Sequence, residues 1–261
     1  MGMGGMPGGW RAVVRGWCVG LVALWTSATL AAAPGGGAAG APVPATAGTP
    51  YTIAVLGDSL ASSIGDTLIN QFRNDPRIRI LRKAKPATGF SRYDVFNWQD
   101  QLKEITASNK LDAAIVLMGT NDRQAIHLDN FRAAPFASDE WRKIYSERFD
   151  AFARHLSERG VWVIWVGLPV MQNKAFDKGM RTIDAIYQQR SARHCFTYVS
   201  LYEKTADGNG EFMASGLDAQ GRRKVLRAND GIHFTTAGYE VITRVVLDAM
   251  RQDVVACEPA P

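Results

Sequence analysis

The chain has 261 residues, of which 46% are hydrophobic and 21% charged. This apolar fraction excludes a disordered chain, and the 25 glycines lack the strict period of collagen. The formal net charge is only +5, and Arg11 and Arg15 contribute to it from a segment that we expect to be removed. A charge this small gives no reason to expect nucleic acid as a partner.

A targeting segment is the first feature along the chain. Arg11 and Arg15 precede an uncharged stretch at 16–30 and three alanines at 31–33. This order is typical of a secretory signal peptide, and the apolar run is short for a membrane span. We therefore expect a signal peptide over residues 1–33 and an exported protein, periplasmic or secreted. A retained N-terminal membrane anchor is the alternative.

The stretch at 34–50 consists mainly of Gly, Ala and Pro and lacks bulky apolar side chains. This composition predicts a flexible linker, followed by one folded domain over residues 51–261. Cys18 belongs to the expected signal peptide, which leaves Cys195 and Cys257 in the mature protein. These two cysteines could form one disulfide or remain free thiols, because the sequence does not give their separation in space.

From residue 51 onward, apolar runs alternate with stretches whose apolar residues recur at helical spacing. In chain order, the predicted elements are strand 51–57, helix 60–72, strand 77–81, strand 113–118, helix 139–159, strand 161–166, helix 176–194, strand 196–201 and helix 236–251. Alternation of this kind is typical of parallel sheets covered by helices on both faces. The sequence therefore predicts one three-layer α/β/α domain with a mostly parallel five-stranded sheet. The glycine-rich stretch 207–221 predicts a hairpin or a lid beside the site.

Three polar groups fall where ligands bind in such sheets, beyond the carboxyl ends of the strands. Ser59 ends a Gly-Asp-Ser turn after the first predicted strand, and Asn121 lies in a Gly-Thr-Asn-Asp turn after the third. Asp230 and His233 lie in the loop before the last helix, three residues apart. A serine, a histidine that a carboxylate can orient and an amide donor are the groups that acyl transfer requires.

Each of these signals is weak by itself. A Gly-Asp-Ser or Gly-Thr-Asn-Asp sequence is most often a simple turn, and His233 alone could be a structural histidine. Their joint occurrence at one predicted edge of the sheet, in workable chain order, favours a catalytic site. The neighbouring carboxylates Asp58 and Asp122 are expected to cap or brace their loops rather than to act in catalysis.

The same residues resemble the blocks of the SGNH (GDSL-type) hydrolase family, and more narrowly an exported bacterial branch long labelled as a domain of unknown function. The second block of that family is a lone glycine. Here it must be Gly89, because no other glycine lies between Gly65 and Gly119. The resemblance covers residues 51–252, with all four blocks in order. It implies the flavodoxin-like α/β/α fold of the family.

The resemblance also implies a role for each residue of the site. Ser59 would be the nucleophile, His233 its general base, and Asp230 the carboxylate that holds the histidine tautomer. The oxyanion hole would consist of the backbone N–H groups of Ser59 and Gly89 and the side-chain amide of Asn121. No cofactor or metal is implied.

These roles predict a serine esterase of the cell envelope that hydrolyses small, acetyl-type acyl esters on a carbohydrate. The substrate would be a small acyl ester or an acylated glycan. One alternative is an O-acyltransferase that modifies an envelope polysaccharide with the same triad, together with a membrane acyl-exporting partner. The other is a non-catalytic envelope-binding protein that keeps the fold.

Two weaker features each have two interpretations. The basic run at 222–227, which ends in Arg227, is typical of a solvated face, or it could form a positive rim for an anionic glycan. Trp98 could stack on a sugar, although ordinary packing is the simpler interpretation.

Overall fold

A computed structural model describes residues 49–128 and 131–252. The predicted signal peptide lies outside the described residues, as do nearly all of the predicted linker, Cys18 and Cys257. Within the described part, Cys195 is disulfide-bonded. No helix in this part of the chain is long and apolar enough to cross a membrane.

One central sheet organises the domain. In chain order, its strands are β1 (Tyr51–Gly57), β2 (Ile78–Arg82), β3 (Ala113–Leu117), β6 (Trp162–Val166) and β7 (Thr197–Val199). Their spatial order is β2-β1-β3-β6-β7, and every neighbouring pair is parallel. This is the flavodoxin-like order, so the predicted fold class is confirmed.

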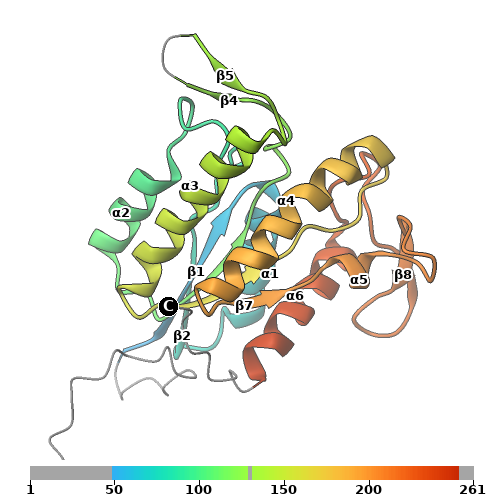
Figure 1. Ribbon diagram of the computed structural model, residues 1–261. Helices are drawn as coiled ribbons and strands as arrows, with labels where there is room; N and C mark the ends of the chain where they lie inside the picture. Colours follow the sequence, from blue (N-terminus) through green and yellow to red (C-terminus); the bar gives the residue numbers. More distant parts are fainter. Residues whose placement is uncertain (1–48, 129–130, 253–261) are drawn as a thin grey trace, which may run out of the picture. The chain divides into compact units, whose positions relative to one another are not determined.

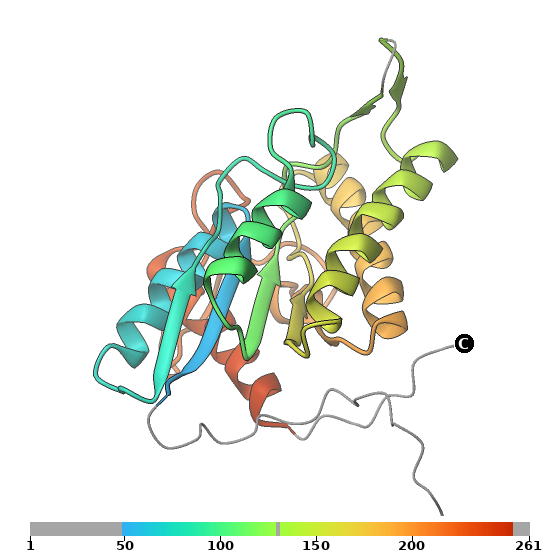
Figure 2. The same ribbon diagram turned by 90° about the vertical axis from the view of Figure 1, so that its left-hand side faces the viewer.

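Five long helices cover the two faces of the sheet. They are α1 (Ser59–Phe72), α2 (Trp98–Ser108), α3 (Asp139–Ser157), α4 (Lys174–Arg193) and α6 (Thr236–Arg251). Helices α1 and α6 pack together on one face, and α2, α3 and α4 form a layer on the other (Figures 1 and 2). The result is the expected three-layer arrangement.

Local sequence signals explain where the helices begin. Asp58 caps α1, Ser138 caps α3 and Thr235 caps α6, each accepting a hydrogen bond from a backbone N–H of the first turn. Two of these caps, Asp58 and Thr235, adjoin site residues. The start of α1 therefore fixes the backbone at Ser59, and the start of α6 fixes the backbone that follows His233.

The core is apolar and rich in aromatic rings. Every residue of β3 and of β6 is buried, as expected for central parallel strands covered on both faces. Phe90, at the carboxyl edge of the sheet, packs against Trp165 and Phe152. Trp98 is fully buried in this core, so it packs and does not offer a surface for a sugar.

Several elements were not predicted from the sequence. These are helix α2 and three short elements: α5 (Tyr202–Thr205) and the hairpin strands β4 (Ile126–His127) and β5 (Ala133–Ala134). The glycine-rich stretch forms part of a second hairpin, β8 (Ser215–Leu217) with β9 (Arg223–Val225). The expected hairpin is thus present, although it continues beyond residue 221.

Candidate active site

The three polar groups singled out in the sequence meet at the carboxyl edge of the sheet. Ser59 is the first residue of α1, directly after β1, and His233 lies two residues before the cap of α6. The Ser59 Oγ is 2.7 Å from the His233 Nε2, although the two residues are 174 positions apart in the chain. A hydroxyl and an imidazole at this distance can exchange a proton.

Asp230 holds the other side of the imidazole. Its Oδ2 lies 2.7 Å from the His233 Nδ1, and its Oδ1 accepts hydrogen bonds from the backbone N–H groups of Ile232 and His233, both at 2.9 Å. Partial burial raises the pKa of Asp230, but these hydrogen bonds outweigh it and lower the pKa to about 2. The carboxylate is therefore ionised at neutral pH and orients the imidazole.

The side chains of Asp230 and His233 are accessible from solvent. The side chain of His233 is 37% exposed and that of Asp230 49% exposed. Ser59 itself is half-buried at the helix N-terminus, where free N–H groups favour negative charge. A substrate carbonyl can therefore reach the hydroxyl without any movement of the core.

Asp58 connects the Gly-Asp-Ser turn with the loop that follows β3. It is fully buried, and its Oδ1 accepts the Leu60 N–H at 3.0 Å. Its Oδ2 accepts the N–H groups of Gly119 and Thr120, each at 3.1 Å, and the Thr120 hydroxyl at 2.7 Å. The expectation that Asp58 caps and braces its loop is confirmed.

Gly57 lets this turn pass directly against β3. Its φ is +134°, a backbone conformation that residues with a side chain rarely adopt. An added Cβ would also lie 1.8 Å from the carbonyl oxygen of Leu117. The first glycine of the Gly-Asp-Ser turn is therefore required by both conformation and space.

Asp122 braces the loop that contains Gly89. Its buried carboxylate accepts the N–H groups of Phe90 at 2.9 Å and Ser91 at 2.8 Å, and the hydroxyl of Tyr145 at 2.7 Å. Burial raises the pKa of Asp122, and these hydrogen bonds oppose that shift. The expected bracing role of Asp122 is confirmed as well.

Asn121 lies beside the same loop. Its Nδ2 donates a hydrogen bond to the backbone oxygen of Thr88 at 3.1 Å, directly before Gly89. Its other close contact, with the Thr120 hydroxyl, is at 3.5 Å and therefore weak. The Asn121 amide thus contacts the loop of Gly89, and Thr120 beside it contacts Asp58, the residue before Ser59.

Sequence reasoning missed two residues of the site. Tyr145 lies on the buried face of a predicted helix, and nothing in the spacing showed that its hydroxyl meets Asp122. Arg227 was placed in a basic run that would form either a solvated face or a positive rim, yet it is only 3% exposed and hydrogen-bonds the loop of Asp230. The signal for Arg227 was its position three residues before a predicted catalytic residue.

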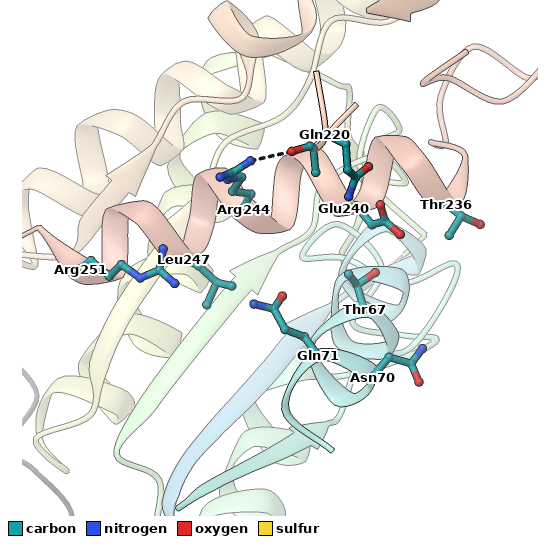
Figure 3. Close-up of a pocket in the computed structure, with 10 residues that line it drawn as sticks. Thr67, Asn70, Gln71, Gln220, Thr236, Glu240, Arg244, Leu247 and Arg251 are labelled. Carbon is teal, nitrogen blue, oxygen red and sulfur yellow. Dashed lines mark hydrogen bonds between the residues drawn. The ribbon is translucent and has the colours of Figure 1, made fainter. Parts of the chain in front are cut away.

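A separate recess lies between α1 and α6 (Figure 3). It begins beside Thr236, the first residue of α6, and follows the helices to Arg251, the last. Its lining, which includes Thr67, Gln71 and the side chain of Arg244, contains none of the predicted site residues. The described residues contain no cluster of His, Cys, Asp or Glu able to hold a metal ion.

The parallel five-stranded sheet and the Ser-His-Asp arrangement at its carboxyl edge define an SGNH (GDSL-type) hydrolase fold. Within that class, the chain belongs to the family described as "Protein of unknown function (DUF459)", whose model matches residues 52–249. No curated protein sequence matches the chain. The matched range contains all four blocks, and its description agrees with the branch of unknown function that the sequence resembles.

Solved structures with the same fold include several hydrolases. LAE5, an alpha/beta hydrolase from the metagenome of Lake Arreo, is 18% identical with a TM-score of 0.54, covering 82% of this chain and 98% of its own. Axe2, an acetylxylan esterase from Geobacillus stearothermophilus, is 14% identical with a TM-score of 0.53, covering 81% and 99%. A GDSL-like lipase from Bacteroides thetaiotaomicron is 12% identical with a TM-score of 0.54, covering 77% and 87%.

Proposed function

We propose that this protein is a serine esterase that hydrolyses small acyl esters through Ser59, His233 and Asp230. The observation that carries the proposal is the unbroken hydrogen-bond chain from the Ser59 Oγ through the imidazole to the Asp230 carboxylate, with both links at 2.7 Å. A serine hydroxyl becomes a useful nucleophile when a base of this kind is in contact with it.

The reaction would proceed in two halves. His233 Nε2 takes the Ser59 proton as Oγ attacks the ester carbonyl. The imidazolium then donates this proton to the leaving oxygen, which departs as an alcohol. Water, deprotonated by the same imidazole, attacks the acyl-enzyme and releases the acid and free Ser59. Asp230 stabilises the imidazolium in both halves, and its low pKa keeps it ionised throughout.

Three N–H donors would stabilise the tetrahedral oxyanion. Two are the backbone N–H groups of Ser59 and Gly89. The third is the second amide hydrogen of Asn121, whose first is used by the Thr88 carbonyl. Each donor of this kind contributes on the order of 3 kcal/mol to the transition state.

The substrate and location form the finer part of the proposal. An acetyl-type ester on a carbohydrate is supported by the solvent access of the triad and by the likeness of the fold to the acetylxylan esterase Axe2. Export to the periplasm or beyond is supported by the order of charge, apolar run and alanines in residues 1–33. On these grounds we propose that the protein acts in the cell envelope.

The direct test is Ser59→Ala in the purified domain. We expect it to lower turnover of p-nitrophenyl acetate by about 10⁴-fold or more and to abolish labelling by a fluorophosphonate, since both need the activated hydroxyl. Ser108→Ala, at the exposed end of α2, is the matched control and should behave as the wild type. Wild-type protein that neither turns over esters nor labels would favour a non-catalytic binding protein.

Product analysis identifies the acyl acceptor. With an acetylated oligosaccharide, the esterase releases acetate into solution. An acetyl group found instead on a sugar hydroxyl of an added polysaccharide would make the protein an acyltransferase with the same acyl-enzyme.

A further inference from the structure

Arg227 is a buried cation that hydrogen-bonds backbone carbonyl groups. Its side chain is 3% exposed, and its guanidinium lies over the rings of Phe234 and Phe212, at 4.3 and 4.7 Å from their centroids. Burial lowers the pKa of Arg227 to about 10, against the attraction of Asp230, so the guanidinium is still charged at neutral pH. A buried charge is costly unless its donors are satisfied.

The donors of Arg227 converge on the loop that contains the catalytic pair. Nη2 donates to the backbone oxygens of Gly231 at 3.3 Å and Ile232 at 3.0 Å, and Nε approaches the His233 oxygen at 3.4 Å. Three successive carbonyl groups therefore turn inward, toward one guanidinium.

Two of these peptide groups also contact Asp230 through their N–H groups. The Gly231 carbonyl and the Ile232 N–H belong to one peptide group, and the Ile232 carbonyl and the His233 N–H belong to the next. Both N–H groups donate to the Asp230 Oδ1 at 2.9 Å. Each peptide dipole thus lies between a cation at its oxygen and an anion at its hydrogen, which stabilises both contacts.

Arg227 also anchors this loop to the β6–α4 connection. Nη1 donates to the Val170 oxygen at 2.7 Å. The Gln172 N–H donates to the Gly231 oxygen at 3.1 Å, and an added Cβ at Gly231 would lie 2.4 Å from the Gln172 Cβ. The orientation of the two peptide groups is therefore fixed relative to the sheet.

We propose that Arg227 is a positioning residue: by holding the Gly231 and Ile232 carbonyls, it aims the adjoining N–H groups at Asp230 and so fixes the carboxylate against His233. The role rests on the proposed esterase function, but the arrangement it creates can be observed without turnover. Arg227 does not touch substrate and acts only through the two peptide groups.

The experiment uses two variants. Arg227→Met removes the charge and the donors while keeping an apolar chain, and Arg227→Lys keeps a cation that cannot bridge successive carbonyls. We expect kcat for p-nitrophenyl acetate to fall by about 10- to 100-fold with KM nearly unchanged, because misplacement of a catalytic group acts on the chemical step. Arg223→Met, on exposed β9, is the matched control and should keep the wild-type kcat.

A spectroscopic signal separates this role from a purely structural one. The proton between the His233 Nδ1 and Asp230 should resonate far downfield in the ¹H NMR spectrum, and Asp230→Asn assigns it by its disappearance. In folded Arg227 variants we expect this resonance to broaden or disappear. If Arg227→Met does not fold, Arg227→Lys decides.

An unchanged resonance in a folded variant would overturn the proposal, whatever its esterase activity. Wild-type protein that shows the resonance but hydrolyses no ester would instead refute the proposed function alone. The two failures are therefore distinguishable.

Discussion

The carboxylate of Asp122 occupies the space into which any side chain at position 89 would extend. A Cβ added to Gly89 would lie 2.3 Å from both carboxylate oxygens of Asp122. The same carboxylate holds the next two N–H groups, those of Phe90 and Ser91. The close contact and the hydrogen bonds together fix the two peptide groups that follow Gly89, the residue whose own N–H the proposed oxyanion hole requires.

Gly89→Ala should therefore damage both activity and stability. The added methyl group must displace Asp122 or the loop, so we expect kcat to fall by about 10²- to 10³-fold, the effect of losing one oxyanion donor. We expect the free energy of unfolding to fall by about 1–3 kcal/mol, as for other overpacked sites. Steady-state kinetics and urea unfolding provide the two measurements.

Gly208→Ala is the matched control for that substitution. A Cβ at Gly208 meets nothing within 4 Å. The variant should keep the wild-type kcat and lose no stability. Equal kcat values for Gly89→Ala and the wild type would show that the Gly89 N–H does not contribute to the oxyanion hole.

The buried carboxylate of Asp58 should make stability depend on pH. Burial raises the pKa of Asp58 from 3.8 to about 6, and hydrogen bonds from Thr120 and Leu60 oppose only part of the shift. The folded state therefore binds this proton more tightly than the unfolded state. The contribution of Asp58 to the free energy of unfolding should fall as the pH rises from about 4 to about 6, in total by about 3 kcal/mol, and stay level above.

Asp58→Asn isolates this contribution, because the amide does not titrate. Urea unfolding of both proteins between pH 4 and pH 7 measures it as the difference between the wild type and the variant. Asp230, whose pKa is lowered to about 2, contributes equally to both proteins and cancels in the difference. A difference that is independent of pH would contradict the prediction.

Patterns within a short window predicted most of the fold. The continuous apolar runs of β3 and β6 identified central strands, and α6 begins and ends where the sequence predicted. Helix α2 was missed although Asn97 caps it and Trp98, Leu102 and Ile105 lie on its buried face. Trp98 was interpreted as a possible surface for a sugar, and its helical spacing from Leu102 and Ile105 was not used. The hairpin strands β4 and β5, of two residues each, are too short to produce a period.

The candidate reactive residues and the bracing carboxylates Asp58 and Asp122 were predictable, whereas the supports from Tyr145 and Arg227 were not. Ser59, Asn121, Asp230 and His233 occur in short local blocks. The parallel strands β1 and β3 bring the first two blocks to one edge of the sheet, and the loop before α6 brings Asp230 and His233 there. Arg227 was expected at the surface because arginine is rarely buried. Its burial depends on carbonyl groups supplied by the folded backbone of two loops, and no local pattern reports them.

Two buried hydroxyls extend the support of Asp122 into the core. The Tyr145 hydroxyl donates to Asp122 at 2.7 Å and also contacts the Tyr187 hydroxyl. Because a tyrosine has one proton to donate, Tyr187 must donate to Tyr145. Burial raises the pKa of both tyrosines well above 10, so both remain protonated donors. The two hydroxyls thus hold the Asp122 carboxylate from the buried core.

Tyr145→Phe should therefore affect stability and catalysis together. It leaves the buried Asp122 with one donor fewer and Tyr187 without its acceptor, which should cost about 1–3 kcal/mol of unfolding free energy. Tyr198→Phe is the matched comparison, because Tyr198 also donates to a largely buried carboxylate, Asp184, at 2.8 Å. We expect a similar loss of stability in both variants, but a loss of kcat, about tenfold, only in Tyr145→Phe. Thermal unfolding and p-nitrophenyl acetate kinetics measured side by side decide the point. Equal kcat in the two variants would mean that the tyrosine chain supports the core and not the oxyanion loop.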